Sequence, residues 1–495
     1  MRERDDRHRE LVSEVSGLPE ADAARYLTSA HIVLAWATDA ERTRAGRALV
    51  RTAANLIVRF APGIRIANRS CFATEVAELL RQIDSSARPM STAVIDPVLV
   101  QLGGGPANCH VSGSADGWTA IVSGTGDALP PVTDTSNVLG AHAAAAIVAS
   151  EVFRHALPLR EEFQWHAPLT RYSVFDYGAP ESAAPEVGTP QLRTVPLLVG
   201  VGAIGQASID TLASLRTTGT IRCVDKGYVD DATNLNRSVL ALEQDLATSS
   251  PKVDLATRRV ADSDLRVIPH LEELSSVLAK INDGGIPWPT VVASALDSPE
   301  DRRTLQGIWP DVTLDAATGG SMVQIFRYIA ESETACLRCL HAPAASGPSY
   351  EQTMADRTGM SVAEVAEALA QPLSPLEEST VNRMKPDVRA LAEEHLGSDI
   401  CGFLSAVEAL GDAPGSERRL VSVSFASYLA GVFLAAELVK AELGIDTRLI
   451  GRYHIDPLAN LGPEGPFTQG RRASCFCVTR ARQVSLYRRE MVGRG

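Results

Sequence analysis

A glycine-rich turn near the middle of the chain constrains the fold more than any other feature. An apolar run over 195–199 leads directly into a G-x-G-x-x-G pattern, and a helical pattern then continues to about residue 215. The three glycines, Gly200, Gly202 and Gly205, let the backbone turn tightly and approach a phosphate, while the start of the helix supplies N–H donors. The segment therefore predicts an α/β fold with a nucleotide site at one edge of its sheet.

An acidic residue after the next predicted strand strengthens this interpretation. Asp225 ends the strand expected over 220–224, where a carboxylate can accept hydrogen bonds from ribose hydroxyls. The glycines alone could serve a tight strand–helix connection, but that role does not need the acid. A nicotinamide dehydrogenase shares both features, so the kind of nucleotide depends on residues further along the chain.

Basic and amide side chains in the following segment favour a polyphosphate. Asn234 and Arg237 lie in the loop after Asp225, and Lys252 follows them. Arginine can grip phosphate oxygens with two hydrogen bonds, and lysine acts as a point charge. Hydride transfer requires neither cation, whereas a solvated arginine and lysine on a surface loop would not explain the whole cluster. The cluster therefore favours ATP.

A second acid is expected at the same edge of the sheet. Asp297 follows a strand predicted over 290–295, and ligands of open α/β sheets bind at the carboxyl ends of the strands. A carboxylate there can hold Mg²⁺ against the phosphates. The same aspartate could instead cap the helix that follows, and the two roles are compatible.

Four of the eight cysteines form two close pairs, Cys336 with Cys339 and Cys475 with Cys477. Four thiolates can close a tetrahedral zinc site that joins the end of the chain to the domain. A redox role for Cys336 and Cys339 is the alternative. Three other cysteines are expected in the core, namely Cys71, Cys109 and Cys223.

In this order, the motifs resemble those of the ThiF superfamily over roughly residues 195–480. That superfamily includes the thiamin and molybdopterin sulfur-carrier adenylyltransferases and the ubiquitin-activating enzymes. The resemblance implies a structural Zn²⁺ on the four paired cysteines. Lys226 and Ser238 depart from it, since the family commonly has a second acid and often a glutamine at these places. It also implies an ATP and Mg²⁺ site built from Gly200, Gly202, Gly205, Asp225, Asn234, Arg237, Lys252 and Asp297.

The reaction implied by the resemblance is adenylation of the C-terminal carboxylate of a ubiquitin-like protein. In the family, a cysteine at about the place of Cys401 accepts the activated carboxyl as a thioester, although a buried structural role is equally open for Cys401. Arg237, Lys252 and Asp297 would act in the first step, and a conjugating enzyme would be the final acceptor. The alternatives are an adenylyltransferase acting on a peptide or sulfur carrier without a thioester, and a non-catalytic nucleotide-binding scaffold.

The expected fold is a Rossmann-like adenylation domain with a second, inactive adenylation-like α/β domain before it. The turn at 37–41 carries no glycine, so the first domain is expected to bind no phosphate. It would support the active domain in an intrachain pseudo-dimer or a homodimer and lend it Arg25 or Arg171. This two-part layout suggests a bacterial-type conjugation system linked to antiviral defence. The expected boundaries are 1–160 for the inactive domain, 161–190 for a linker, 191–342 for the first part of the adenylation domain, 343–405 for a helical insertion with Cys401, and 406–495 for the second part.

Charge and hydropathy exclude several other classes of protein. The chain has 47 basic and 60 acidic residues, and its net charge of −13 disfavours nucleic acid as a partner. Its longest apolar stretches, such as 143–148 and 428–434, fall short of the roughly 20 residues that cross a bilayer. The charged segment 1–10 has no apolar core of a secretory signal behind it, so a cytoplasmic location without a membrane partner is expected.

Overall fold

The computed structural model divides the chain into two compact units, Met1–His341 with Val421–Gly495, and Ala342–Leu420. Each unit is described by itself. Within 12–494, the structure describes all residues except 14, 20–21, 23–24, 27–28, 90–95, 107, 161–162, 164–165, 182, 343–349, 371–373, 399, 401–402, 405–406, 408–421, 446, 448, 450 and 459–464.

The first half of the larger unit contains a six-stranded sheet in the order β2-β1-β3-β4-β5-β6. The first four strands along this order are parallel, and β5 and β6 run antiparallel to their neighbours. β6 lies within 161–190, the range expected as a linker. So short a strand leaves little periodicity in a sequence rich in proline and alanine, and the sequence therefore did not indicate it. The elements are β1 (His31–Trp36), η1 (Thr38–Glu41), α3 (Arg44–Val58), β2 (Gly63–Ile66), α4 (Cys71–Ile83), β3 (Val98–Leu102), β4 (Val111–Asp116), β5 (Thr119–Ser123), α5 (Leu139–Ala156) and β6 (Thr170–Ser173).

The second half contains a larger sheet in the order β10-β9-β8-β11-β12-β13-β14, with β7 paired to β9. Its strands are parallel except for β13 and β14. The elements are β7 (Gln191–Leu192), β8 (Leu197–Val199), α6 (Ala203–Ser214), β9 (Thr218–Val224), α7 (Thr233–Arg237), α8 (Glu243–Ala247), α9 (Lys252–Arg259), β10 (Leu265–His270), α10 (Leu274–Asn282), β11 (Val291–Ser294), α11 (Pro299–Leu305), η3 (Gln306–Ile308), β12 (Val312–Gly319), β13 (Met322–Ile329), α12 (Leu337–Leu340), α18 (Ser424–Leu443), β14 (Gly451–Ile455), α19 (Phe476–Thr479) and α20 (Ala481–Arg494).

The two halves repeat one topology. In each, a first strand leads into a helix and pairs on one side with the next strand and on the other with a later parallel strand. Two antiparallel strands then complete the sheet, and a long apolar helix precedes the last of them. β1 and α3 correspond to β8 and α6 in this scheme, and α5 corresponds to α18. The predicted α/β fold with a second α/β domain before the glycine turn is therefore confirmed.

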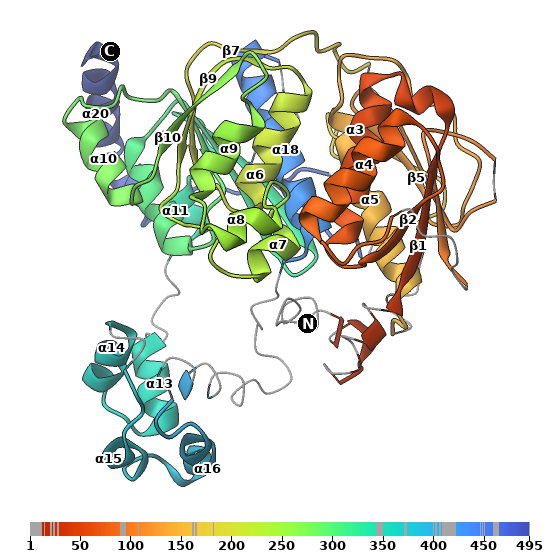
Figure 1. Cartoon of the computed structure of the whole chain (residues 1–495). Coiled ribbons are helices and arrows are strands. Elements are labelled where there is room, and N and C mark those ends of the chain that lie inside the picture. The colour runs from red at the N-terminus through yellow and green to blue at the C-terminus, as the bar shows by residue number, and fades with distance from the viewer. Residues whose placement is uncertain are drawn as a thin grey trace. The chain divides into compact units, whose positions relative to one another are not determined.

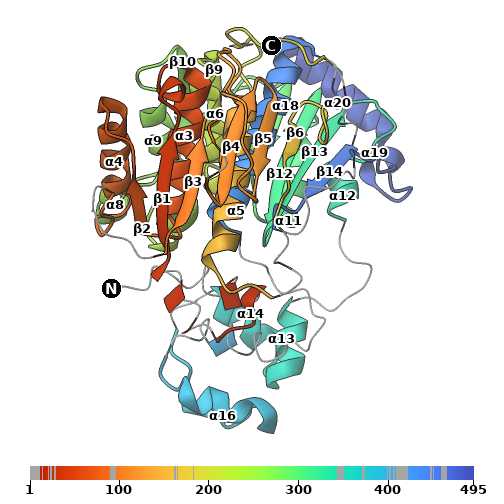
Figure 2. The ribbon, with the colours of Figure 1, turned by 90° about the vertical axis from the view of Figure 1, so that its right-hand side faces the viewer.

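Helix α18 forms the centre of the larger unit, between the two halves (Figures 1 and 2). It packs on α6, β12 and β13 of its own half and on α5 of the first half. Among the described residues it is the one helix long and apolar enough to cross a membrane, yet 94% of its most apolar window is buried inside the protein. The hydropathy of α18 therefore reflects its place in the core.

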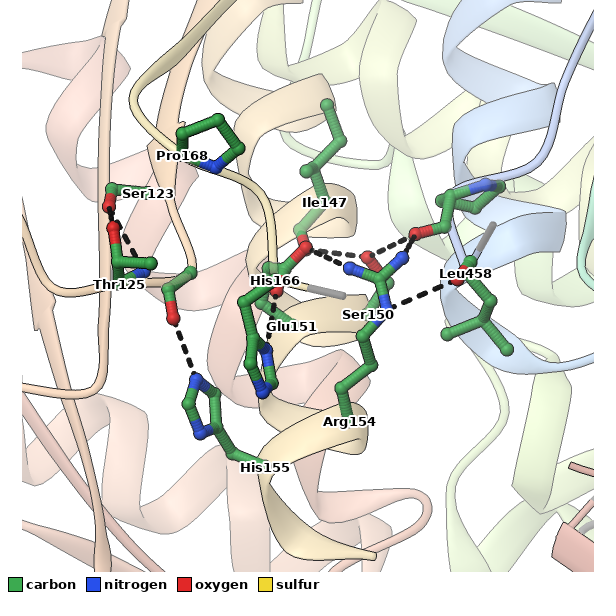
Figure 3. A network of polar contacts seen from close by, with 12 residues as sticks. Ser123, Thr125, Ile147, Ser150, Glu151, Arg154, His155, His166, Pro168 and Leu458 are labelled. Carbon is green, nitrogen blue, oxygen red and sulfur yellow. Dashed lines mark hydrogen bonds and ion pairs between the residues drawn. The ribbon is translucent and has the colours of Figure 1, made fainter. Parts of the chain in front are cut away.

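Buried polar contacts join the two halves across this core. Arg154 on α5 forms an ion pair with Glu151, and both side chains are fully buried. Its guanidinium donates hydrogen bonds to the carbonyl of Pro457 and, at 3.2 Å, to that of Leu458 in the second half (Figure 3). Tyr177 likewise donates to Glu437 on α18 at 2.6 Å. These hydrogen bonds hold the two halves in one arrangement, because separation would remove the acceptors of Arg154 and the donor to Glu437.

The smaller unit is helical and has an apolar core of its own. Its helices are α13 (Tyr350–Thr358), α14 (Val362–Ala370), α15 (Glu378–Val381) and α16 (Pro386–Glu394). Buried side chains between Met354 and Val407 form this core. The expected helical insertion is thus a separate folded body, and Cys401 lies outside the described residues.

Candidate active site

The glycine turn joins β8 to α6 in the way the sequence predicts. Gly200 has φ +91° and lies so close to the strand β11 that a Cβ would come within 2.6 Å of the carbonyl oxygen of Ala295. A Cβ on Gly205 would come within 2.1 Å of the carbonyl oxygen of Gly200. Around Gly202, the residue that precedes α6, a Cβ would meet nothing within 4 Å. The turn therefore leaves open space at the N-terminus of a helix, where backbone donors favour a phosphate.

Asp225 lies against this turn from the end of β9. One carboxylate oxygen accepts a hydrogen bond from the amide of Val201 at 2.6 Å, and the other accepts from the amide of Gly227 at 2.7 Å. Each oxygen keeps a second lone pair, so the carboxylate can also accept a hydrogen bond from a ribose hydroxyl. The neighbouring Lys226 is exposed and pairs with Glu273 at 2.9 Å.

Lys252 comes to the same place from the start of α9. Its amide donates to the carbonyl of Gly227 at 3.0 Å. A Cβ on Gly227 would lie 2.9 Å from Nζ of Lys252 and 3.0 Å from a carboxylate oxygen of Asp225, so both side chains border this glycine. In the described part of the chain Lys252 has no ion-pair partner. Its charge is therefore available to a ligand phosphate beside the glycine turn.

Helix α7 carries the predicted asparagine and arginine. Asn234 is 4% exposed, its amide nitrogen donates to the carbonyl of Asp231 at 3.0 Å, and its Oδ1 has no hydrogen-bond partner. Arg237 is half-buried at the last residue of the helix. A buried oxygen without a donor is costly, so Asn234 is ready to accept a hydrogen bond from a ligand.

Gln206 connects the segment after α7 to the glycine turn, a role that sequence reasoning missed. The side chain is fully buried, donates to the carbonyl of Val201 at 3.1 Å and accepts from the amide of Leu240 at 3.1 Å. Gln206 is therefore a positioning residue for the turn. The signal in the sequence was an amide side chain in the first turn of the helix, beside the glycine pattern.

Asp297 follows β11 with an exposed carboxylate that makes no hydrogen bond within the described residues. Capping of α11 falls to Ser298, whose hydroxyl accepts from the amides of Glu300 and Asp301. The carboxylate of Asp297 is thus free for a metal. Buried Arg302, whose structural role was missed, donates to the carbonyl of Leu296 at 3.0 Å and holds the backbone just before this aspartate.

The corresponding turn in the first half is occupied by protein groups. Residues 38–41 form η1, and Glu41 accepts hydrogen bonds from the indole of Trp36 at 2.6 Å and the hydroxyl of Ser70 at 2.8 Å. Thr43 caps α3 by accepting from the amide of Gly46 at 3.0 Å. The side chain of Glu41 fills this turn and Thr43 occupies a backbone donor of α3, so the turn lacks the open space found at Gly202.

Arg59, at the end of α3, supports the nucleotide segment of the second half. It is 6% exposed and donates to the carbonyls of Leu235, Val239 at 2.9 Å and Ala241 at 3.2 Å. The predicted candidates for an arginine from the first half differ in setting: Arg25 is 80% exposed beside Asp22, and Arg171 is exposed on β6. Arg59 escaped sequence reasoning because nothing in its local pattern marks a contact with a segment 176 residues away.

The four paired cysteines converge from the two ends of the second half. The Sγ atoms of Cys336 and Cys339 are 3.8 Å apart, Cys336 and Cys475 3.7 Å, and Cys339 and Cys477 3.5 Å. A tetrahedron with Zn–S bonds of about 2.3 Å has edges of about 3.8 Å, so the cluster can hold Zn²⁺. The thiol of Cys336 and the amide of Arg472 donate to Cys339 and lower its pKa.

The remaining described cysteines lie apart from this cluster. Cys223 is buried in β9, and burial raises the pKa of its thiol, as expected of a core residue. Cys109 is half-buried, and Cys71 is exposed at the start of α4. The expectation of a core position was therefore wrong for Cys71, because the first residue of an amphipathic helix lies at its solvent-facing end.

Comparison with known proteins places the chain in a family. The model of the ThiF family matches residues 184–463, more than half of the chain. The uncharacterized protein y4jF of Sinorhizobium fredii is 29% identical over 402 residues, which cover 76% of this chain and 73% of that protein.

Solved structures show a weaker likeness. A structure of E. coli MccB with ATP is 14% identical and covers 74% of this chain and 98% of that one, with a TM-score of 0.36. PaaA is 17% identical and covers 54% of this chain and 70% of that one, with a TM-score of 0.30. From the matched family model and the order of the motifs within it, we conclude that the chain belongs to the ThiF family of adenylating enzymes.

Proposed function

We propose that this enzyme uses ATP and Mg²⁺ to adenylate the C-terminal carboxylate of a ubiquitin-like protein. The observation that carries the proposal is the convergence of Asp225 and Lys252 at Gly227, next to a glycine turn with open space at Gly202. The unpaired carboxylate of Asp297 follows β11, whose next residue, Ala295, contacts the same turn. Family membership supports adenylation of a carboxylate; the ubiquitin-like substrate rests on the resemblance of the motifs.

In the proposed reaction, an oxygen of the substrate carboxylate attacks the α-phosphorus of ATP. The bond between that phosphorus and the bridging oxygen breaks, and pyrophosphate leaves with the electron pair. Lys252 and Arg237 would stabilise the charge that develops on the phosphates, and Asn234 would donate or accept a hydrogen bond beside them. Asp297 would hold Mg²⁺, which neutralises phosphate charge when bound. Positioning and electrostatics suffice for this step, without a covalent protein intermediate.

The second proposed step transfers the acyl group from the adenylate to Sγ of Cys401, and AMP leaves. The resulting thioester would pass to a cysteine of a conjugating enzyme. This step rests on the position of Cys401 in the sequence. The setting we propose is a cytoplasmic, bacterial-type ubiquitin-like conjugation system with a role in antiviral defence, supported by the two-part architecture.

We also propose that the four-cysteine cluster binds one structural Zn²⁺. The sulfur–sulfur distances of 3.5–3.8 Å match the edges of a zinc–thiolate tetrahedron. All four side chains are buried or nearly so, as is typical of a structural site. The metal would fix the end of the chain to the second half.

The deciding experiment is ATP–pyrophosphate exchange with candidate ubiquitin-like proteins, run beside a non-reducing gel. We expect exchange that depends on the carrier and a thiol-sensitive adduct that disappears in Cys401→Ala but persists in the control Cys71→Ala. Exchange without an adduct would favour an adenylyltransferase that acts on a peptide or sulfur carrier. ATP binding without exchange for any carrier would favour the non-catalytic scaffold.

A further inference from the structure

A cavity of about 690 Å³ lies where the first half of the larger unit meets the second half. Its walls come from one face of α3, the ends of α6 and α9, and the segment 239–242, with single side chains from α4, α5 and α18. The glycine turn, Asp225, Lys252 and Asp297 are not among its lining residues. The cavity is therefore separate from the adenylation site, and its volume is in the range of about 300–1,000 Å³ typical of small-molecule sites.

Seven arginines line this cavity, which we call the arginine pocket, although the chain carries a net charge of −13. The first half contributes Arg42, Arg44, Arg47 and Arg51. The second half contributes Arg216, Arg258 and Arg259. Residues 44, 47 and 51 share one face of α3, because side chains three and four positions apart are neighbours on a helix. Such a concentration of guanidinium groups favours an anion with several oxygens.

Five of the arginines have carboxylate partners. Arg42 pairs with Asp39, Arg47 and Arg51 share Glu75, and the two from α9 are held by buried acids, Arg258 by Asp245 and Arg259 by Asp210. Arg44 and Arg216 form no ion pair with any residue that the structure describes. These two guanidiniums are therefore the ones available to a ligand.

Arg44 is the first residue of α3 and is partly buried. Its Nη1 is inaccessible to solvent and has no hydrogen-bond acceptor in the described residues. Burial, and after it the charge of Arg216, lower the pKa of Arg44, while the exposed Asp134 raises it from a distance. Two guanidiniums that repel each other, one of them partly buried, are stabilised when an anion lies between them.

Arg216 occupies a backbone position that glycine usually takes. It follows α6 with φ +54°, its amide donates to Ala213 and the amide of Thr217 donates to Leu212, which closes the helix end. A side chain other than glycine is disfavoured in this left-handed conformation. An exposed arginine occupies this position, although glycine would adopt the backbone conformation without strain. Its side chain lines the arginine pocket.

The rest of the pocket is partly apolar. Leu79 comes from α4, Leu240 and Leu242 from the segment after α7, and Leu255 from α9. These side chains leave room for the carbon skeleton or ring of a ligand beside the charged groups. A cavity of this volume that combines charged and apolar side chains suits a small molecule.

We propose that the arginine pocket binds a small molecule that carries at least two phosphate groups, at a site distinct from the adenylation site. Arg44 and Arg216 contact its phosphates, and the paired arginines around them add positive potential. The leucines contact its carbon skeleton.

Calorimetry with inorganic tripolyphosphate tests the charged part of this proposal. The experiment uses the full-length chain with the substitutions Arg237→Ala and Lys252→Ala, so that the adenylation site does not bind the probe. We expect this chain to bind tripolyphosphate. Arg44→Gln and Arg216→Gln should each weaken the affinity at least about tenfold, because each charged hydrogen bond contributes at that level. Arg266→Gln, on the exposed side of β10, is the matched control and should leave the affinity unchanged.

Arg216→Gly separates binding from folding. Glycine relieves the left-handed backbone, so this variant should unfold at an equal or higher temperature and yet bind tripolyphosphate at least about tenfold more weakly. The absence of binding to the parent chain would overturn the proposal. So would an affinity unchanged by both substitutions, or binding of hexaglutamate in preference to tripolyphosphate.

Discussion

The sequence allows Asp297 two roles, to hold a metal ion and to cap helix α11, and the structure assigns the cap to Ser298. Ser298 caps α11 with its hydroxyl, and the carboxylate of Asp297 is left exposed and unpaired in the described structure. A side chain that contributes nothing to packing or hydrogen bonding can be replaced without loss of stability. At this residue, function and stability can therefore be measured separately.

We expect Asp297→Asn to lower ATP–pyrophosphate exchange by about 10²-fold or more, because the metal loses its charged ligand while the shape of the site is kept. The free energy of unfolding should change by no more than about 0.5 kcal/mol. Asp301→Asn, in the first turn of α11, is the control and should retain exchange. Full exchange in Asp297→Asn would remove this residue from the site.

His142 makes the stability of the protein depend on pH. It is fully buried, and its Nδ1 lies 2.8 Å from the hydroxyl of Tyr428 and 3.0 Å from that of Thr52. Burial lowers the pKa of His142 to about 4, while Asp210 raises and Arg259 lowers it. The unfolded chain, with a histidine pKa of about 6.5, binds the proton more readily than the folded chain at intermediate pH.

We therefore expect the contribution of neutral His142 to be complete above about pH 6.5 and to be lost as the pH falls from about 6.5 to about 4, by about 3 kcal/mol in all. Urea unfolding at several pH values measures this slope. His142→Gln should flatten it, whereas His31→Gln, exposed on β1, should leave it unchanged. Parallel slopes for both variants would assign the pH dependence to other groups.

Among the secondary-structure elements, α3 differs from its counterpart α6 in what its two ends contact. Helix α6 starts at an open glycine turn, whereas α3 starts at a turn filled by Glu41 and Thr43. The far end of α3 instead delivers Arg59 to three carbonyls of the segment that carries α7. The first half thus holds the backbone of a segment of the second half in place.

We expect Arg59→Met to loosen this segment, because it removes hydrogen bonds from a buried charge to three carbonyl groups. The free energy of unfolding should fall by about 3 kcal/mol, since hydrogen bonds to charged groups contribute about 1.5–3 kcal/mol each and do not add fully. Hydrogen exchange should quicken over 235–241, and ATP should bind more weakly. Arg81→Met, whose partner Glu78 is on the surface, should show none of these changes.

On the scale of the whole molecule, two features join distant parts of the chain, a central helix and a cysteine cluster. The apolar helix α18 packs against both halves, and the cysteine cluster joins residues 336–339 to 475–477. The helix acts through burial of its side chains. The cluster would act through a bound metal ion, which four cysteine side chains can hold as thiolates.

We expect the purified protein to contain one zinc ion per chain by elemental analysis. Removal of the metal by a chelator, or Cys475→Ser, should lower the free energy of unfolding by several kcal/mol, because metal binding stabilises only the folded arrangement. Hydrogen exchange should rise over α19 and α20. Cys71→Ser is the control, and an equal zinc content in Cys475→Ser would show that the metal lies elsewhere.

Much of the fold could be predicted from the sequence, and the structure brings several of the predicted site residues close together. The glycines, Asp225, Lys252 and Asp297 were recognisable because a strand, a turn and a helix place them by local rules of backbone geometry. The cysteine pairs were recognisable because ligand spacing is itself a local pattern.

Only the tertiary structure decided which side chains hold the backbone around the candidate site and which groups meet across the two halves. Arg59, Gln206 and Arg302 act on backbone carbonyls or amides, whose positions leave no trace in the residue types of the segments that carry them. The arginine pocket likewise joins side chains of α3 and α9 with Arg216, which follows α6, and no local sequence pattern indicates that these segments meet. Local propensity determines elements over a few residues, whereas such contacts arise from the packing of whole layers, and packing depends on the entire chain.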